Sequence, residues 1–185
     1  MKKTLQISVI GSAGAEEYPK NQGTKIENLI LAEEVGKLLA ENGCTVINGG
    51  KGGIMEAASR GAKKANGKTV GIISGTKRLQ SNNFTDIEIL TGSNAAGLDE
   101  FLLVLMSDAL IVIGGGAGTL EEITIAYRNK KPIIAISNTA GWADKLAGSF
   151  LDERETIRVE KVKSPKQAVS RAISLARKNL HTLPL

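Results

Sequence analysis

The chain has 185 residues, of which 42% are hydrophobic and 23% are charged, and its mean hydropathy is −0.04. This composition is typical of a compact globular domain and excludes intrinsic disorder, collagen and coiled coil. The formal charge of +5 is a modest excess of 24 basic over 19 acidic residues, and the chain has only three phenylalanines, two tyrosines and one tryptophan. Single-stranded nucleic acids usually stack on aromatic side chains, so we expect no nucleic-acid partner.

The sequence also argues against export, membrane insertion and metal binding. The one cysteine, Cys44, cannot form an intramolecular disulfide, and no apolar run approaches the ~18 residues that a membrane helix needs. The start, MKKTLQISVIGSAGA, is interpreted as a first strand rather than a signal peptide, because Gln6 and Ser8 interrupt its short apolar part. We therefore expect a cytoplasmic protein with no membrane association. We expect no metal site, because Cys44 and the lone histidine, His181, are far apart.

Predicted strands and helices alternate along the chain. In chain order we predict a strand at Leu5–Ile10, a helix at Thr24–Asn42, a strand at Cys44–Asn48, a helix at Ile54–Asn66, a strand at Lys68–Ser74, a strand at Asp86–Thr91, a helix at Leu98–Ser107, a strand at Ala109–Ile113, a helix at Thr119–Asn129, a strand at Pro132–Ile136, a helix at Ala140–Phe150, a strand at Thr156–Val159 and a helix at Pro165–Lys178. Most strands are continuous apolar runs, which favours an α/β fold: a Rossmann-like doubly wound parallel sheet with helices on both faces. We expect a single nucleotide- or phosphate-binding domain over residues 1–185, with a disordered tail at about 180–185.

Glycine is over-represented, with 21 residues in 185 against a usual share of roughly 7%. Three clusters, Gly11 with Gly14, Gly49–Gly53 and Gly114–Gly118, each follow a predicted strand. The carboxyl ends of parallel strands share one edge of a sheet, so these loops are expected to meet in one crevice. Glycine permits close approach of a ligand to the backbone, and a following helix presents free N–H groups, which favours a phosphate or nucleotide site over mere tight turns. Neither GxxxxGK[ST] nor GxGxxG occurs, so ATP hydrolysis by a P-loop and NAD-dependent hydride transfer are not expected.

The segment ALIVIGGGAGTLEEI, at Ala109–Ile123, resembles the GGGxGTxxE motif of a Rossmann-like superfamily. That superfamily includes the molybdenum cofactor carrier proteins and the cytokinin-activating nucleoside 5'-monophosphate phosphoribohydrolases, often labelled "possible lysine decarboxylase". INGGKGGIMEAASRGA at Ile47–Ala62 is similar to the family's second glycine loop, and IGSAG at Ile10–Gly14 agrees with the first. The hydrolases have proline where Gly114 stands here, so the resemblance is closer to the carrier-like branch.

The resemblance implies that the backbone of Gly115, Gly116, Gly118 and Thr119 cradles a phosphate, with the Thr119 hydroxyl as a further donor. Glu122 matches the glutamate that acts on ribose or water when the hydrolases cleave the N-glycosidic bond, whereas Glu121 is interpreted as a helix-dipole residue. The loops and the resemblance together give these candidate ligand-binding residues: Gly11, Ser12, Gly14, Gly49, Gly50, Gly52, Gly53, Gly114, Gly115, Gly116, Gly118 and Thr119. The resemblance also implies a homo-oligomer, a dimer or larger.

The sequence departs from the hydrolases in the helix before Ala109. They carry an Arg-Lys pair there, and counting back from Asp108 places Asp99 and Glu100 at the two positions. No arginine lies between Arg78 and Arg128, so the charge reversal does not depend on the register. Whether the two acidic side chains face the crevice or lie on a solvated helix face is left open.

These observations lead to one main hypothesis and two alternatives. The main hypothesis is carrier-like binding of a phosphate-bearing small molecule, either a nucleotide or a molybdenum cofactor-like pterin phosphate, with no cofactor required for the protein itself. The first alternative is a phosphoribohydrolase that cleaves nucleoside 5'-monophosphates to free base and ribose 5-phosphate, with Glu122 as its catalytic residue. The second is a nucleotide-dependent sensor, which nothing in the sequence selects. Lysine decarboxylation is not expected, because no constellation for pyridoxal phosphate can be identified.

Overall fold

The computed structural model describes residues 4–14 and 24–182. The elements in chain order are β1 (Gln6–Gly11), α1 (Ile26–Glu41), β2 (Thr45–Asn48), α2 (Ile54–Lys64), β3 (Lys68–Ile73), β4 (Ile87–Leu90), α3 (Leu98–Met106), β5 (Ala109–Ile113), α4 (Ala117–Arg128), β6 (Ile133–Ile136), α5 (Gly141–Leu146), β7 (Glu160–Val162) and α6 (Pro165–Thr182). The seven strands form one sheet in the order β4-β3-β2-β1-β5-β6-β7, and every neighbouring pair is parallel. The predicted Rossmann-like doubly wound parallel sheet is confirmed.

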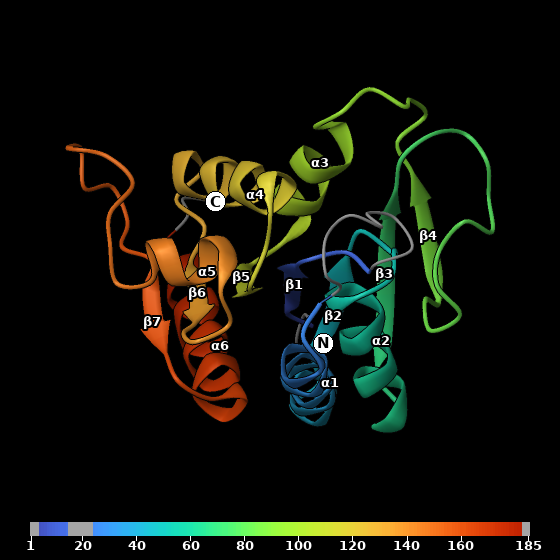
Figure 1. The fold of residues 1–185 in the computed structure, drawn as a ribbon, viewed down its shortest axis with the longest axis horizontal. Coiled ribbons are helices and arrows are strands. Elements are labelled where there is room, and N and C mark those ends of the chain that lie inside the picture. Colours follow the sequence, from blue (N-terminus) through green and yellow to red (C-terminus); the bar gives the residue numbers. More distant parts are fainter. Residues whose placement is uncertain (1–3, 15–23, 183–185) are drawn as a thin grey trace.

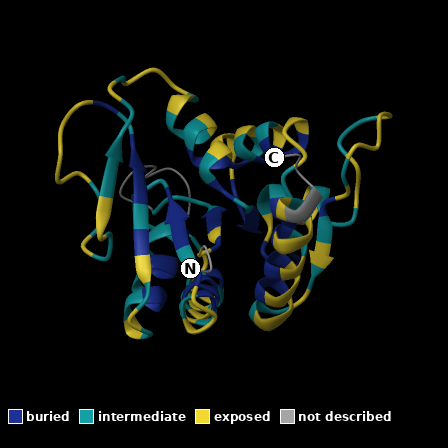
Figure 2. Cartoon of the chain, turned by 180° about the vertical axis from the view of Figure 1, so that it is seen from behind, coloured by how far each residue is buried: buried dark blue, intermediate teal, exposed yellow. Residues whose placement is uncertain are grey.

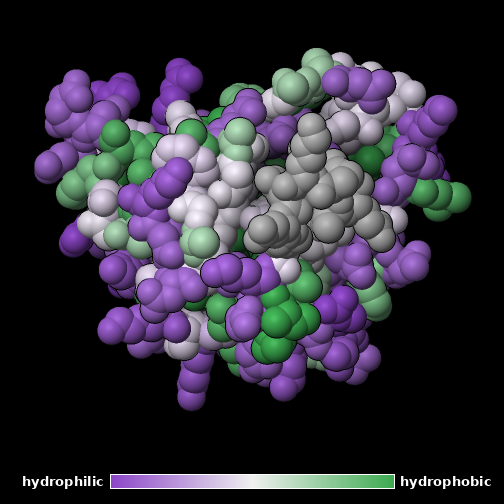
Figure 3. All heavy atoms as spheres, viewed as in Figure 1, coloured by the Kyte–Doolittle hydropathy of each residue, from purple (hydrophilic) through white to green (hydrophobic). Residues whose placement is uncertain are grey.

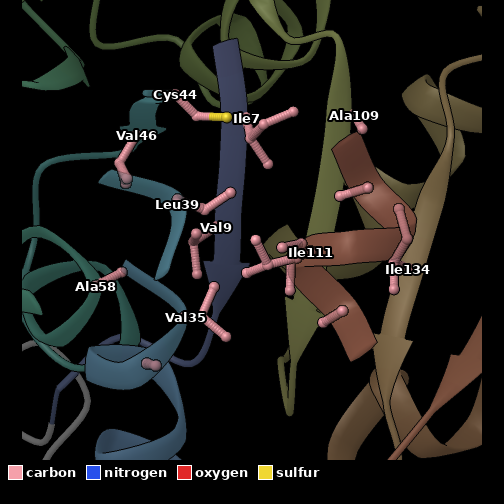
Figure 4. Packing of buried hydrophobic residues seen from close by; sticks show 14 of the residues in the cluster. Ile7, Val9, Val35, Leu39, Cys44, Val46, Ala58, Ala109, Ile111 and Ile134 are labelled. Carbon is pink, nitrogen blue, oxygen red and sulfur yellow. The ribbon is translucent and has the colours of Figure 1, made fainter. Parts of the chain in front are cut away.

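The sheet is covered by helices on both faces, which gives three layers (Figure 1). The helices α1, α2 and α6 contribute to one apolar cluster, and α3, α4 and α5 contribute to the other. Alternation along β1 sends Ile7 and Val9 into the first cluster and Ile10 into the second. Figure 4 shows Ile7 and Val9 packed beside Val35 and Leu39 of α1. Burying both faces of the central strands explains their continuous apolar runs.

Burial falls toward one edge of the sheet. The strand β5 is buried at all five positions, whereas every residue of the edge strand β4 is exposed or partly exposed. Figure 2 shows the contrast between the dark central strands and the paler β4. The core therefore lies under the strands that carry the glycine loops, so those loops rise from the most rigid part of the sheet.

Two glycines let α1 and α2 pack backbone to backbone. A Cβ atom added to Gly36 would overlap the carbonyl group of Ala58, and one added to Gly61 would overlap the carbonyl group of Glu33. Across the same contact, Arg60 donates to Glu33 at 2.8 Å, and Lys64 also pairs with Glu33. The close contact fixes the position of α2, the helix that follows the loop after β2.

The last strand was predicted at Thr156–Val159, and this is wrong. Val159 is buried, but its backbone bonds Gly148 and Ser149 at 2.8 and 2.9 Å rather than the sheet. Pairing with β6 begins one residue later, at Glu160–Val162. The sequence EKV is exposed or half-buried at the sheet edge, so it carries no continuous apolar run.

Several helix ends also differ from the predictions, and among them α1 begins at Ile26 rather than Thr24 and α2 ends at Lys64 rather than Asn66. The helix α5 stops at Leu146 rather than Phe150, because Gly148 adopts a φ of +84°. The helix α4 starts two residues early, at Ala117. The helix α6 continues to Thr182, so the predicted tail at residues 180–182 is helical, and residues 183–185 lie outside the described part. None of the helices in residues 4–14 and 24–182 is long and apolar enough to cross a membrane.

Candidate functional site

The three glycine loops meet in a pocket of about 480 Å³ at the carboxyl edge of the sheet. The pocket lies where the chain order reverses, with β1 between β2 and β5. It is lined by Gly11, Ser12, Ala13, Gly14, Thr24, Gly49, Lys51, Met55, Asp99, Glu100, Leu103, Gly115, Gly116, Ala117, Gly118, Thr119 and Glu122. In Figure 3 a pale area lies left of the centre of the visible face, bordered by both hydrophilic and hydrophobic side chains.

The loop after β5 presents the start of α4 to the pocket. Gly116 is the N-cap, and the first bond within α4 runs from the Leu120 N–H to the Gly116 carbonyl oxygen at 3.0 Å. The N–H groups of the first helical turn have no partner inside the helix and carry its positive dipole end. Gly118 and Thr119, predicted to precede the helix or begin it, lie within this turn. The arrangement is suited to an anion such as a phosphate.

Gly115 needs the conformational freedom of glycine. Its φ is +103°, and an added Cβ would overlap the side chain of Thr119. The Gly115 N–H donates to Ser12 Oγ at 3.1 Å, and its carbonyl oxygen accepts from the Trp142 N–H at 3.1 Å. These bonds tie the loop to the loop after β1 on one side and to α5 on the other, so the start of α4 is held in place before any ligand binds.

The loops after β1 and β2 hold each other. Gly53 has a φ of +67°, and a Cβ there would overlap the backbone of Ser12, Ala13 and Gly14. The Ile54 N–H donates to the Ser12 carbonyl oxygen at 3.1 Å. The two loops therefore form one rigid wall of the pocket.

Eight of the twelve candidate ligand-binding residues line the pocket, namely Gly11, Ser12, Gly14, Gly49, Gly115, Gly116, Gly118 and Thr119. The other four, Gly50, Gly52, Gly53 and Gly114, do not line it. The Gly50 N–H donates to Asn48 Oδ1 at 2.8 Å, and the Gly114 N–H donates to Thr139 Oγ1 at 2.9 Å. These contacts give Gly50 and Gly114 structural roles in shaping the loops. Ligand binding by any of the twelve stays a prediction.

An acidic wall faces the glycine loops. Asp99 and Glu100 of α3 line the pocket together with Glu122 of α4, so the two residues at the charge-reversed positions face the crevice. Asp99 Oδ2 accepts a hydrogen bond from Ser74 Oγ at 2.7 Å. Glu100 Oε2 is buried and has no hydrogen-bond partner, while Glu100 Oε1 lies 3.5 Å from the position that a Cβ of Gly118 would take. The Glu100 carboxyl group therefore lies beside the first turn of α4.

Crowding of these carboxyl groups changes how they ionise. Burial raises the pKa of Glu122 well above its usual range, and the charges of Glu100, Asp99 and Glu121 raise it further. The pKa of Glu100 is also raised, by burial first and then by its hydrogen bond to Asp99. Burial opposes ionisation of Asp99, but hydrogen bonds from Glu100 and Ser74 hold its pKa below the usual value. Asp99 is thus the group that carries the negative charge most readily.

Sequence reasoning missed several residues of the pocket. Lys51 is the one basic side chain among the described residues that line it, and its charge favours the ionised form of Asp99. Its position in the run GGKGG, directly after a strand, was the signal available in the sequence. Thr24 and Met55 carried no such signal. Within residues 4–14 and 24–182, no three His, Cys, Asp or Glu side chains are grouped so that they could hold a metal ion.

The comparisons with known proteins identify the family. The sequence profile of the SLOG cluster4 family matches residues 4–169, and the chain belongs to this family. An uncharacterized protein of Archaeoglobus fulgidus is 41% identical over 134 residues, which cover 72% of this chain and 81% of the relative. A cytokinin riboside 5'-monophosphate phosphoribohydrolase of Mycobacterium tuberculosis is 30% identical over 140 residues, which cover 72% of this chain and 75% of the relative.

Solved structures agree with this assignment. TM1055 superposes with a TM-score of 0.81 at 29% identity, covering 92% of this chain and 99% of that one. The molybdenum cofactor carrier protein of Chlamydomonas reinhardtii (28% identical) and the molybdenum cofactor binding protein of Rippkaea orientalis (29%) each superpose with a TM-score of 0.78, covering 95% of this chain and 99% of theirs. DNA processing protein A of Helicobacter pylori, at 16% identity and a TM-score of 0.66 over 92% of this chain and 80% of that one, shares the fold alone. The predicted membership of the carrier and phosphoribohydrolase superfamily is confirmed.

Proposed function

We propose that this member of the SLOG cluster4 family binds a phosphate-bearing small molecule in the pocket at the carboxyl edge of its sheet and acts as a carrier. The observation that carries the proposal is the start of α4, whose first-turn N–H groups open onto a pocket of about 480 Å³. That volume lies within the range of roughly 300–1,000 Å³ usual for small-molecule sites. Binding needs only this geometry and no reactive side chain.

The ligand is a nucleotide or a pterin phosphate of the molybdenum cofactor type. Support for a pterin phosphate comes from the molybdenum cofactor carrier protein of Chlamydomonas reinhardtii and the molybdenum cofactor binding protein of Rippkaea orientalis, since the superposition covers 99% of each of those chains. Support for a nucleotide comes from the phosphoribohydrolase of Mycobacterium tuberculosis. Both ligands carry a phosphate monoester, and the first turn of α4 provides backbone donors for that group.

The second candidate function is hydrolysis of nucleoside 5'-monophosphates. The observation that favours it is Glu122, which lines the pocket in α4, beyond the proposed phosphate site at the start of that helix. A carboxylate there would stabilise the cation-like sugar that forms when an N-glycosidic bond breaks. Asp99 and Glu100 count against this function, because they place negative charge where the hydrolases that the chain resembles have two cations.

One experiment tests both functions. The purified protein is incubated with a panel of nucleoside 5'-monophosphates and with a pterin phosphate; binding is followed by thermal shift, and free base is detected by chromatography. Carrier-like binding predicts a higher melting temperature with no release of base. Release of base that disappears in Glu122→Ala would establish hydrolysis instead. Nucleotides and pterin phosphates that fail to bind at millimolar concentration would refute both.

The predicted homo-oligomer and cytoplasmic location remain separate proposals. Light scattering of the purified chain would test the first: a mass of about 39 kDa, twice the 19.5 kDa of one chain, is the expected result for a dimer. Fractionation of the source cells would test the second.

A further inference from the structure

The acidic wall poses a problem for the proposed phosphate site. Glu100 Oε1 lies beside Gly118, in the turn of α4 whose N–H groups are proposed to hold the phosphate. Asp99 and Glu122 line the same pocket, and Lys51 is the one basic side chain among its described lining residues. Ionised carboxyl groups in one pocket with a phosphate repel it, since charges interact strongly within a Debye length of about 8 Å. The wall must therefore contact a different part of the ligand.

One oxygen of the wall is an acceptor without a donor. Glu100 Oε2 is buried and has no hydrogen-bond partner, and leaving a buried polar atom unpaired is costly. Asp99 Oδ2 is satisfied by Ser74, so the Asp99 carboxylate is held in position by the protein. A ligand group that donates hydrogen bonds would satisfy Glu100 without adding negative charge to the pocket. A second phosphate or a carboxylate would instead add to the repulsion from the acidic wall.

The short distance between Glu100 and the proposed phosphate site limits which ligand group can be the donor. Because Glu100 lies beside the first turn of α4, the donor must be on the part of the ligand that adjoins the phosphate, not at a distant ring edge. In a 5'-nucleotide that part is the ribose with its 2'- and 3'-hydroxyl groups. Carboxylates that accept from ribose hydroxyls are a recurring device of doubly wound folds.

We propose that Asp99 and Glu100 are specificity residues that select phosphate esters carrying neighbouring hydroxyl groups, with Glu100 accepting directly from a hydroxyl of the sugar and Asp99 holding Glu100 in place. The inference rests on the proposed phosphate site. It gives a function to the charge reversal: the two positions read hydrogen-bond donors of the ligand instead of binding its phosphate. The raised pKa of Glu100, which follows from burial and from Asp99, is consistent with an acceptor that avoids full charge beside a phosphate.

The test compares adenosine 5'-monophosphate with its 2'-deoxy and 3'-deoxy forms by calorimetric titration, with inorganic phosphate as a fourth ligand. We expect the wild type to prefer the full ribose over at least one deoxy form by about tenfold or more, the usual worth of a hydrogen bond to a charged or buried group. In Glu100→Gln, which replaces one carboxyl oxygen by an NH2 donor and cannot ionise, we expect this ratio to fall toward one, while the affinity for inorganic phosphate is unchanged or higher. These opposite directions separate selection of hydroxyls from a general loss of binding.

Glu121→Gln is the matched control. Glu121 is exposed, adjoins Glu122 in α4 and does not line the pocket, so the substitution removes the same charge without removing an acceptor from the site. It should keep the ribose preference. Asp99→Asn provides a second variant, with melting temperatures measured for all three, and it should weaken the preference less than Glu100→Gln.

Each remaining result refutes something definite. Equal affinity of the wild type for ribose and both deoxyribose ligands would overturn the selection of hydroxyls but leave the phosphate site standing. A preference that survives in folded Glu100→Gln and Asp99→Asn would overturn the role of these residues. No binding of inorganic phosphate, of any nucleotide or of a pterin phosphate would refute the proposed function itself, and this inference with it.

Discussion

Two adjacent glycines in the loop after β5 allow the phosphate site to be tested independently of protein stability. Gly115 has a φ of +103°, and a Cβ there would overlap Thr119, whereas a Cβ on Gly116 would have nothing within 4 Å. For Gly115→Ala, the left-handed backbone costs about 1–2 kcal/mol and the overlap about 1–3 kcal/mol. The total of roughly 2–5 kcal/mol corresponds to a fall in melting temperature of roughly 4–20 °C for a domain of this size.

Gly116→Ala is the matched substitution one residue away. Its stability should stay within about 0.5 kcal/mol of the wild type, because the added methyl group meets no protein atom. The methyl group does project at the start of α4, where the phosphate is expected, so affinity for inorganic phosphate should fall by roughly tenfold. Thermal unfolding and calorimetric titration measure the two effects. A stable Gly115→Ala would refute the strain argument, and unchanged phosphate affinity in Gly116→Ala would refute the position of the phosphate.

Three further substitutions test the packing and the ionisation of the chain. Gly36→Ala, which would normally favour a helix by about 1 kcal/mol, should instead lower the free energy of unfolding in urea, because the new Cβ overlaps the Ala58 carbonyl group; a gain would contradict the close α1–α2 contact. Glu122→Gln should stabilise the protein at pH 8, and this gain should vanish as the pH falls toward 4.5. Folding raises the pKa of the Glu122 carboxyl group, so this group destabilises the folded protein as the pH rises above the ordinary pKa. A gain that is equal at both pH values would exclude ionisation as its cause. Glu88 accepts hydrogen bonds from the Ser81 hydroxyl and from the N–H groups of Ser81, Leu79 and Gln80, and these bonds lower its pKa to about 2. Protection of the three amides from hydrogen exchange should therefore hold above pH 4.5 and be lost as the pH falls toward 2. In Glu88→Gln this protection should be lost at every pH.

The fold was largely predictable because its central strands are buried on both faces. Runs such as ALIVI at Ala109–Ile113 have no polar alternation, which is the mark of a parallel sheet under two helical layers. The edge strand β7 was not predicted correctly because it lacks this burial. Its sequence EKV is exposed or half-buried, so it has no apolar run that would mark it as a strand. The start of α4 was missed because glycine weakens helices, and Gly116 is the N-cap of α4 while Gly118 lies in its first turn.

The position of the site could be predicted more fully than its chemistry. Glycine clusters after strands locate the crevice because the topology of a parallel sheet gathers those loops at one edge. The direction of the Asp99 and Glu100 side chains could not be read from α3, since helical spacing alone does not say which face meets a pocket formed by other elements. The role of Gly50 and Gly114 could not be read either, because positive φ serves a buried turn and a ligand contact equally well.

The charge pattern of the pocket bears on the choice between binding and cleavage. A hydrolase needs Glu122 as a carboxylate when positive charge develops on the sugar. Burial already opposes that state, and the carboxyl groups of Asp99 and Glu100 oppose it further. Two cations at residues 99 and 100, as in the phosphoribohydrolases that the chain resembles, would favour both the Glu122 carboxylate and the phosphate. The charge reversal therefore weakens two requirements of hydrolysis at once, whereas carrier-like binding requires only that the acidic wall find donors on the ligand.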